Sequence, residues 1–156
     1  MDARFEDGAD LPLRLMAQGA QDVPVLSALL QDAVFPMGEM TWDRRRRRFA
    51  LMVNRFRWED RDAAAAGHRG YERVQAVLVV EGVLTVQSQG IDRSDRDTVL
   101  SVLDLAFVAG DEGAGRLILT LAGDGAIALE VEALDLSLQD VTRPYLAPSG
   151  KVPSHD

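Results

Sequence analysis

Two short alternating segments on either side of a glycine turn constrain the fold of this chain most strongly. Every second residue of segments 116–122 and 126–132 is a large apolar one, Leu117, Leu119 and Leu121 in the first and Ile127, Leu129 and Val131 in the second, and Gly123-Asp124-Gly125 separates the two segments. A period of two puts the apolar side chains of a strand on one face, and a glycine-rich connection favours a tight hairpin. The pattern therefore predicts an antiparallel hairpin with one buried face and one face toward water.

Three earlier segments have the same strand character. Turn residues bound residues 72–80, 83–89 and 98–108. We interpret these segments and the hairpin as a meander of consecutive antiparallel strands, with Glu81-Gly82 as a hairpin turn and Ala109–Gly115 as a longer connection.

Alternating leucines follow the last of these strands. Residues 134–138 fit either a bulged continuation of that strand or a short terminal helix, and Pro144 ends whichever forms.

The N-terminal part contains the one clear helix pattern. Asp22 is suited to an N-cap and Pro24 to the first turn, and apolar residues then recur at helical spacing over 23–32. Residues 11–17 alternate loosely, which predicts a short strand before this helix.

Two strands are expected after the helix. Residues 34–42 have strand character, although Pro36 favours an edge position. Within residues 48–58 the apolar side chains change face midway, and we expect a β-bulge at Asn54-Arg55 that returns them to one face.

Together these elements predict an α+β fold that is mostly antiparallel β, with one N-terminal helix. We expect a roll or partly open barrel, by analogy similar to pleckstrin-homology folds. The 156 residues suit one domain over 11–141. If the chain has two lobes, we expect their boundary near residues 60–70, and we expect flexible tails over 1–10 and 145–156.

Composition narrows the compartment and the chemistry. The sequence has no cysteine, which removes disulfides and thiolate metal sites and is compatible with a reducing cytoplasm. The longest purely apolar runs, among them Ala76–Val80, are far shorter than a membrane span, and the acidic N-terminus lacks the apolar region of a secretory signal. We therefore expect a cytoplasmic protein without a membrane span.

A run of five arginines, Arg44–Arg48, is the main irregularity in the charge pattern. Ten arginines and five acids lie between Asp43 and Arg73, which gives this segment a net charge of +5 in a chain of −8. Arginine favours carboxylate and phosphate partners, so we expect an anionic small molecule or an acidic protein surface to bind here. The alternative is a solvated turn whose charges block pairing at a strand edge. The acidic remainder and the absence of a recognition motif argue against nucleic acid as the partner. The five candidates are Arg44, Arg45, Arg46, Arg47 and Arg48.

A second group of polar residues lies at the predicted strand end after this run and at the end of the helix. It could form a small-molecule-binding or hydrolytic pocket at the barrel mouth, or a network of surface salt bridges that contributes little stability. The members of this group are Gln31, Asp32, Asn54, Arg55, Arg57, Trp58 and Glu59.

We find no established catalytic or metal-binding motif. Asp92–Asp97 has the oxygen-rich character of a calcium loop, but its arginines and the missing central glycine favour a plain turn. His68 and His155 lack a partner at ligand spacing. The sequence thus predicts a non-enzymatic binding protein without metal or cofactor.

Two segments carry a family resemblance. Asp22–Ala33 and Arg48–Glu59 resemble a family of small uncharacterised bacterial proteins known only as a domain of unknown function. The resemblance covers most of residues 11–141 and implies no activity, substrate or cofactor.

Overall fold

The computed structural model describes residues 12–58, 72–142 and 145–146. The described segments form one α-helix, two 3-10 turns and eleven strands. In chain order they are β1 (Arg14–Ala17), η1 (Ala20–Asp22), α2 (Val23–Leu30), β2 (Val34–Pro36), η2 (Met37–Glu39), β3 (Met40–Asp43), β4 (Arg48–Phe56), β5 (Glu72–Val80), β6 (Val83–Gln89), β7 (Val99–Ala109), β8 (Gly115–Leu121), β9 (Ala126–Val131), β10 (Leu136–Asp140) and β11 (Tyr145–Leu146).

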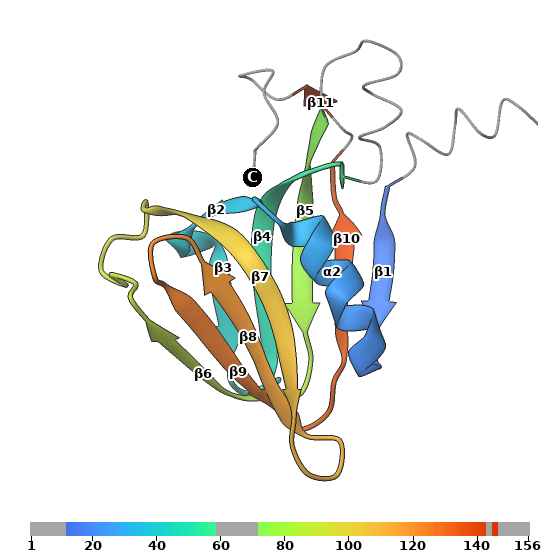
Figure 1. The fold of residues 1–156 in the computed structure, drawn as a ribbon. Helices are drawn as coiled ribbons and strands as arrows, with labels where there is room; N and C mark the ends of the chain where they lie inside the picture. Colours follow the sequence, from blue (N-terminus) through green and yellow to red (C-terminus); the bar gives the residue numbers. More distant parts are fainter. Residues whose placement is uncertain (1–11, 59–71, 143–144, 147–156) are drawn as a thin grey trace, which may run out of the picture.

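The strands form a single curled antiparallel sheet (Figure 1). Its order is β1-β10-β5-β4-β2-β7-β8-β9-β6, with β3 pairing with β4 and β11 pairing with β5 beside this path. The sheet curves into a roll but does not close into a barrel, because β1 and β6 lie at its two ends. The predicted fold class, mostly antiparallel β with one N-terminal helix, is therefore confirmed.

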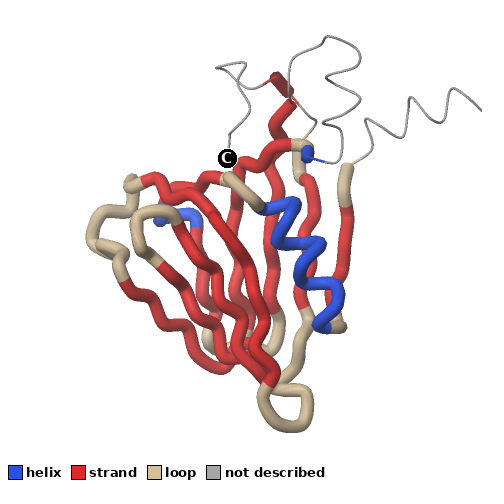
Figure 2. The backbone as a smooth tube through the Cα atoms, in the orientation of Figure 1, coloured by secondary structure: helices blue, strands red, loops and turns tan. Residues whose placement is uncertain are grey.

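Helix α2 packs inside the curve of the sheet (Figure 2). Its buried face, Val23, Leu26, Leu29 and Leu30, joins the same hydrophobic core as the inward side chains of the strands. Burying this face is the main contribution to the stability of so short a helix, since isolated helices of this length are marginal in water.

The predicted helix and strand positions are largely confirmed, but the meander is confirmed only for β7, β8 and β9. Strands β8 and β9 form the expected hairpin, with Leu117 opposite Leu129. Strand β6 pairs with neither β5 nor β7. Strand β5 lies between β4 and β10, β7 lies between β2 and β8, and β6 pairs with β9. Gly82, at a φ of 69°, turns the chain there, and its carbonyl accepts a hydrogen bond from the Glu132 N–H at 3.0 Å. Glu81-Gly82 is thus a corner of the roll and not a hairpin turn.

Two further segments differ in detail from the prediction. Residues 34–42 are interrupted by the turn η2, which divides them into β2 and β3. The leucine segment forms β10, which pairs with β5 and β1 and does not continue β9. The expected strand character of this segment is therefore confirmed, whereas its continuity with β9 and the alternative of a helix are wrong.

The expected bulge at Asn54-Arg55 is also wrong. The register between β4 and β5 runs without a shift from Phe49 opposite Val80 to Phe56 opposite Arg73. The inward row of β4 consequently ends in Arg55, a charged residue, and Phe56, which follows on the other face of the strand, is also buried. Two register shifts occur elsewhere, in β6 and β7.

The predicted loop and lobe boundary at 60–70 lie outside the described residues, as do nearly all residues of the predicted tails. Strand β11 attaches residues 145–146 to β5. No helix in the described part of the chain is long and apolar enough to cross a membrane.

Candidate functional site

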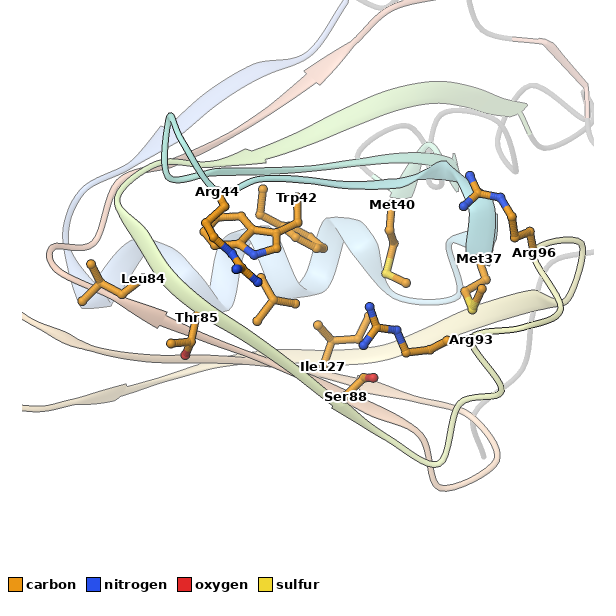
Figure 3. Close-up of a pocket in the computed structure, with 12 residues that line it drawn as sticks. Met37, Met40, Trp42, Arg44, Leu84, Thr85, Ser88, Arg93, Arg96 and Ile127 are labelled. Atoms are coloured by element: carbon orange, nitrogen blue, oxygen red, sulfur yellow. The ribbon is translucent and has the colours of Figure 1, made fainter.

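The open side of the roll carries a cleft between strands β3 and β6. Among the described strands, β3 pairs with β4 alone and β6 pairs with β9 alone, so each has one unpaired edge. The cleft has a volume of about 570 Å³. We call it the seam cleft, and Figure 3 shows its lining: Met37, Met40, Trp42, Arg44, Phe49, Leu84, Thr85, Val86, Ser88, Arg93, Arg96 and Ile127.

Backbone hydrogen bonds close the seam at both ends. At one end the Val83 N–H donates to the Arg47 carbonyl at 2.8 Å. At the other end the Gly38 N–H donates to the Arg96 carbonyl and the Met37 N–H to the Thr98 carbonyl, both at 2.9 Å. The roll is therefore fixed at both ends of the opening and unpaired between them.

The floor of the seam cleft is apolar. Met40 and Trp42 occupy alternate positions of β3, and Trp42 lies opposite the buried Phe49 in the ladder with β4. Val86 and the buried Ile127 line the other side. The floor is thus the edge of the hydrophobic core, which the missing strand pairing leaves accessible.

Three arginines surround this floor. Arg44 lies beside Trp42, whereas Arg93 and Arg96 reach the cleft near Ile127 and Met37 (Figure 3). The lining contains no aspartate or glutamate. Neither Arg44 nor Arg93 makes a hydrogen bond or ion pair through its side chain with any described residue. Guanidinium groups over an apolar floor without a local counter-charge suit a ligand that is apolar and negatively charged.

Arg96 is oriented by the protein itself. Its Nη2 donates to the Gly38 carbonyl at 3.1 Å, and its own carbonyl accepts from the Gly38 N–H. This reciprocal contact attaches the turn after β6 to η2.

That turn, Asp92–Thr98, is held by its own side chains. The N–H and Oγ of Ser94 both donate to Asp92 Oδ1, at 3.0 and 2.6 Å. The Ser94 hydroxyl, followed by the Ser94 N–H, lowers the pKa of Asp92 below its ordinary value. The geometry is that of the predicted plain turn, and no group of metal-ligating side chains is found in the described part of the chain. The turn therefore presents Arg93 and Arg96 on a partly preordered backbone.

The run of five arginines does not act as one cluster. Arg46, Arg47 and Arg48 form ion pairs with Asp43, Glu132 and Glu81 respectively. Arg45 is exposed, and Arg44 alone lines the cleft. The pair of Arg47 links the turn between β3 and β4 to the end of β9, and the pair of Arg48 links the start of β4 to the end of β5.

The second predicted group lies in a different environment. Arg55 is 0% exposed and forms a bidentate pair with Asp140, with Nε to Oδ1 at 3.1 Å and Nη2 to Oδ2 at 3.0 Å. Its Nη1 also donates to the Phe56 carbonyl at 3.0 Å. Asp140 Oδ2 accepts the Leu13 N–H at 2.9 Å as well. The pair therefore joins β4 to β10 and to the residues before β1.

The neighbouring members of this group are connected in the same way. Arg57 pairs with Glu72 at 3.5 Å. Arg73 donates to both the side-chain oxygen and the carbonyl of Asn54, and its guanidinium carbon lies 4.0 Å from the centroid of the Phe56 ring.

Trp58 connects this group to the helix. Its Nε1 donates to the Gln31 carbonyl at 2.8 Å, and its ring lies 5.6 Å from that of Phe56. Asp32, at a φ of 64°, turns the chain from α2 toward β2, and its N–H donates to the Val102 carbonyl at 2.9 Å. Glu59 lies outside the described residues.

The structure thus divides the predicted site residues into two sets. Of the predicted residues, Arg44 lines the seam cleft. The predicted residues Arg55 and Arg57 are buried and bind partners within the protein. Arg93, Arg96, Met37, Met40 and Trp42 were not among the predicted site residues. The signal available in the sequence was the pair Arg93 and Arg96 in a turn that follows a strand. Their proximity to β3 could not be predicted, because it depends on a contact between segments that are distant in the sequence.

Comparison with known proteins gives a family and no activity. A family model described as "Protein of unknown function (DUF2948)" matches residues 13–155. No curated protein and no solved structure matches the chain.

Proposed function

We propose, for a chain that belongs to the DUF2948 family of unknown function, that it is a non-enzymatic binding protein. Its ligand is an anionic group attached to an apolar body, held in the seam cleft. The observation that carries this proposal is the set of three arginines, Arg44, Arg93 and Arg96, around an apolar floor without an acidic residue in the lining.

The size and chemistry of the cleft support this assignment. Its volume of about 570 Å³ lies within the range of about 300–1,000 Å³ that is typical of ligand pockets. Trp42 and Met40 supply an apolar contact surface, and guanidinium groups supply charge-assisted hydrogen bonds, worth about 1.5–3 kcal/mol each.

The charge of the whole chain argues for a compact anion and against a long one. The net charge is −8, so an extended polyanion such as nucleic acid meets repulsion over most of the surface. A carboxylate, sulfonate or phosphate within the seam cleft meets the three arginines first.

A pair of matched fluorescent probes tests the proposal. 8-Anilinonaphthalene-1-sulfonate carries an aromatic body and one negative charge, and N-phenyl-1-naphthylamine is the same body without the sulfonate. We expect the sulfonate probe to bind the native protein more tightly. In the variant R44Q/R93Q/R96Q its dissociation constant should rise at least about tenfold, the equivalent of about 1.4 kcal/mol, while the neutral probe is unaffected.

The control variant R14Q/R45Q/R46Q removes the same number of charges from exposed positions outside the cleft lining. It should bind the sulfonate probe within about twofold of the native protein, since exposed charges outside the site act only through a screened field. Equal losses in the two variants, or unchanged binding in R44Q/R93Q/R96Q, would contradict the proposal.

A further inference from the structure

The unpaired strand edges of the seam cleft identify the kind of ligand more closely. We propose that the natural occupant is an extended acidic peptide segment of another protein, which adds as a strand to the free edge of β6. This inference rests on the proposed function and names the partner of the same site.

Backbone geometry is the first argument. The edge of β6 facing the cleft has no partner strand among the described residues, and β3 across the cleft is likewise unpaired on that side. A free edge presents a row of N–H and C=O groups, and adding a peptide strand is a common way to satisfy them. A small anion would leave those groups to water.

Side-chain alternation is the second argument. Every second side chain of an added strand would point into the roll, where Met40, Trp42 and Ile127 form the apolar floor. The intervening side chains would point to water. An added strand therefore fits this cleft, because the unpaired backbone edges of β3 and β6 form its walls and the hydrophobic core forms its floor.

The distribution of charge is the third argument and sets the composition of the peptide. Arg44 lies at one end of the seam cleft beside Trp42, and Arg93 and Arg96 lie toward the other end near Met37 (Figure 3). A segment with apolar residues at its centre and acidic residues at both ends would place carboxylates near both groups of guanidinium. A basic segment would meet three like charges.

The other end of the sheet provides an internal comparison. Strand β1 pairs only with β10 among the described strands, so it also has a free edge. It has four residues against the seven of β6, and none of them lines the seam cleft. A peptide that only sought an unpaired edge would bind both strands, whereas the proposed peptide selects β6.

The experiment uses the full chain and a synthetic heptapeptide with three apolar central residues and two acidic residues at each end, capped at both termini. Fluorescence anisotropy measures its affinity, and a second peptide with glutamine and asparagine in place of the acids is the charge control. A series of peptides methylated at one backbone nitrogen at a time removes individual N–H donors while keeping every side chain.

We expect the acidic peptide to bind at least tenfold more tightly than its amide control. Methylation should weaken binding at least tenfold at alternate positions and less than twofold at the positions between them. Amide hydrogen exchange should slow in β6 and not in β1 when the peptide is bound. Uniform tolerance of methylation, uniform loss along the peptide, or protection of β1 would overturn the inference.

The outcomes separate this inference from the proposed function. If the sulfonate probe requires the three arginines but the peptide does not bind, the anion site stands and strand addition is wrong. If the variant R44Q/R93Q/R96Q self-associates and the native protein binds neither probe nor peptide, the arginines only protect an edge, and both proposals are wrong.

Discussion

Two sets of arginines in this protein lie in different environments. At one end of the roll, Arg55, Arg57 and Arg73 contact acidic, amide or aromatic groups of other strands. At the seam cleft, Arg44 and Arg93 face an apolar floor without such partners among the described residues. The comparison shows that arginine content alone does not locate a binding site, because the partners within the fold decide which guanidinium groups remain available.

Burial explains the difference. A guanidinium removed from water needs its charge and its donors satisfied, so Arg55 is held by Asp140 and by a backbone carbonyl. The cleft arginines keep contact with solvent and can exchange water for a ligand. The first set is therefore occupied by partners within the fold, and the second is the set that we propose to bind a ligand.

The largest expected effect comes from breaking the buried pair. Arg55→Met leaves the Asp140 carboxylate buried without its cation, which should lower the free energy of unfolding by about 3–5 kcal/mol. Urea denaturation measures the change. Adding Asp140→Leu to Arg55→Met should recover part of the loss, because it removes the isolated charge. A loss below about 1 kcal/mol for Arg55→Met would show that the pair does not hold the strands together.

The two tryptophans sharpen the same comparison. Trp58→Phe removes the indole donor to the Gln31 carbonyl and should lower the free energy of unfolding by about 0.5–1.5 kcal/mol. It should leave the affinity for 8-anilinonaphthalene-1-sulfonate unchanged. Trp42→Ala should weaken the probe severalfold, because the indole forms part of the cleft floor. Urea denaturation and fluorescence titration of both variants measure the two effects. Weaker probe binding in Trp58→Phe together with unchanged binding in Trp42→Ala would contradict the placement of the binding site in the seam cleft.

A smaller effect on stability is expected at the cleft arginines. The variant R44Q/R93Q/R96Q should change the free energy of unfolding by less than about 0.5 kcal/mol at each of Arg44 and Arg93, as is usual for exposed positions. At Arg96 the loss should be about 0.5 kcal/mol, the low end for a net hydrogen bond, because its contact with the Gly38 carbonyl is removed. Thermal and urea denaturation provide the measurement. A large destabilisation would assign these arginines to the fold instead of to a ligand.

The smallest effect concerns the turn that carries Arg93 and Arg96. Ser94→Ala removes the hydroxyl donor to Asp92, so the lowered pKa of Asp92 should rise toward its ordinary value. Because the folded pKa is depressed, the interaction stabilises the turn above the ordinary aspartate pKa and is lost as the pH falls through the folded pKa. An NMR titration of the Asp92 carboxyl group measures the shift. An unchanged pKa would show that the hydroxyl does not hold this turn.

The sequence was sufficient for most strand positions and for the helix, because those follow from local periodicity. It did not show which strands pair across the corner at Gly82, since Val80 and Val83 look like the two sides of a hairpin in any local window. The partner of β5 is decided by contacts with β4 and β10, which are distant in the sequence.

The ion pair between Arg55 and Asp140 was indicated by the sequence pattern, but our prediction interpreted that pattern as a bulge. Phe49, Leu51, Val53 and Arg55 alternate along β4, as Leu136, Leu138 and Asp140 do along β10. The inward row of β4 ends in a positive charge and that of β10 in a negative charge. A bulge at Asn54-Arg55 would have moved Arg55 away from Asp140. The seam cleft had a weaker signal, because its walls come from segments whose meeting requires the whole roll to curve.

NMR detection of the arginine Nε–H groups during titration with 8-anilinonaphthalene-1-sulfonate tests the central claim most directly, since it observes both sets of arginines in one experiment. The account predicts that the signals of Arg44, Arg93 and Arg96 shift in proportion to bound probe while those of Arg55, Arg57 and Arg73 stay in place. Shifts confined to the second set, or spread equally over all exposed arginines, would contradict the assignment of the seam cleft as the binding site.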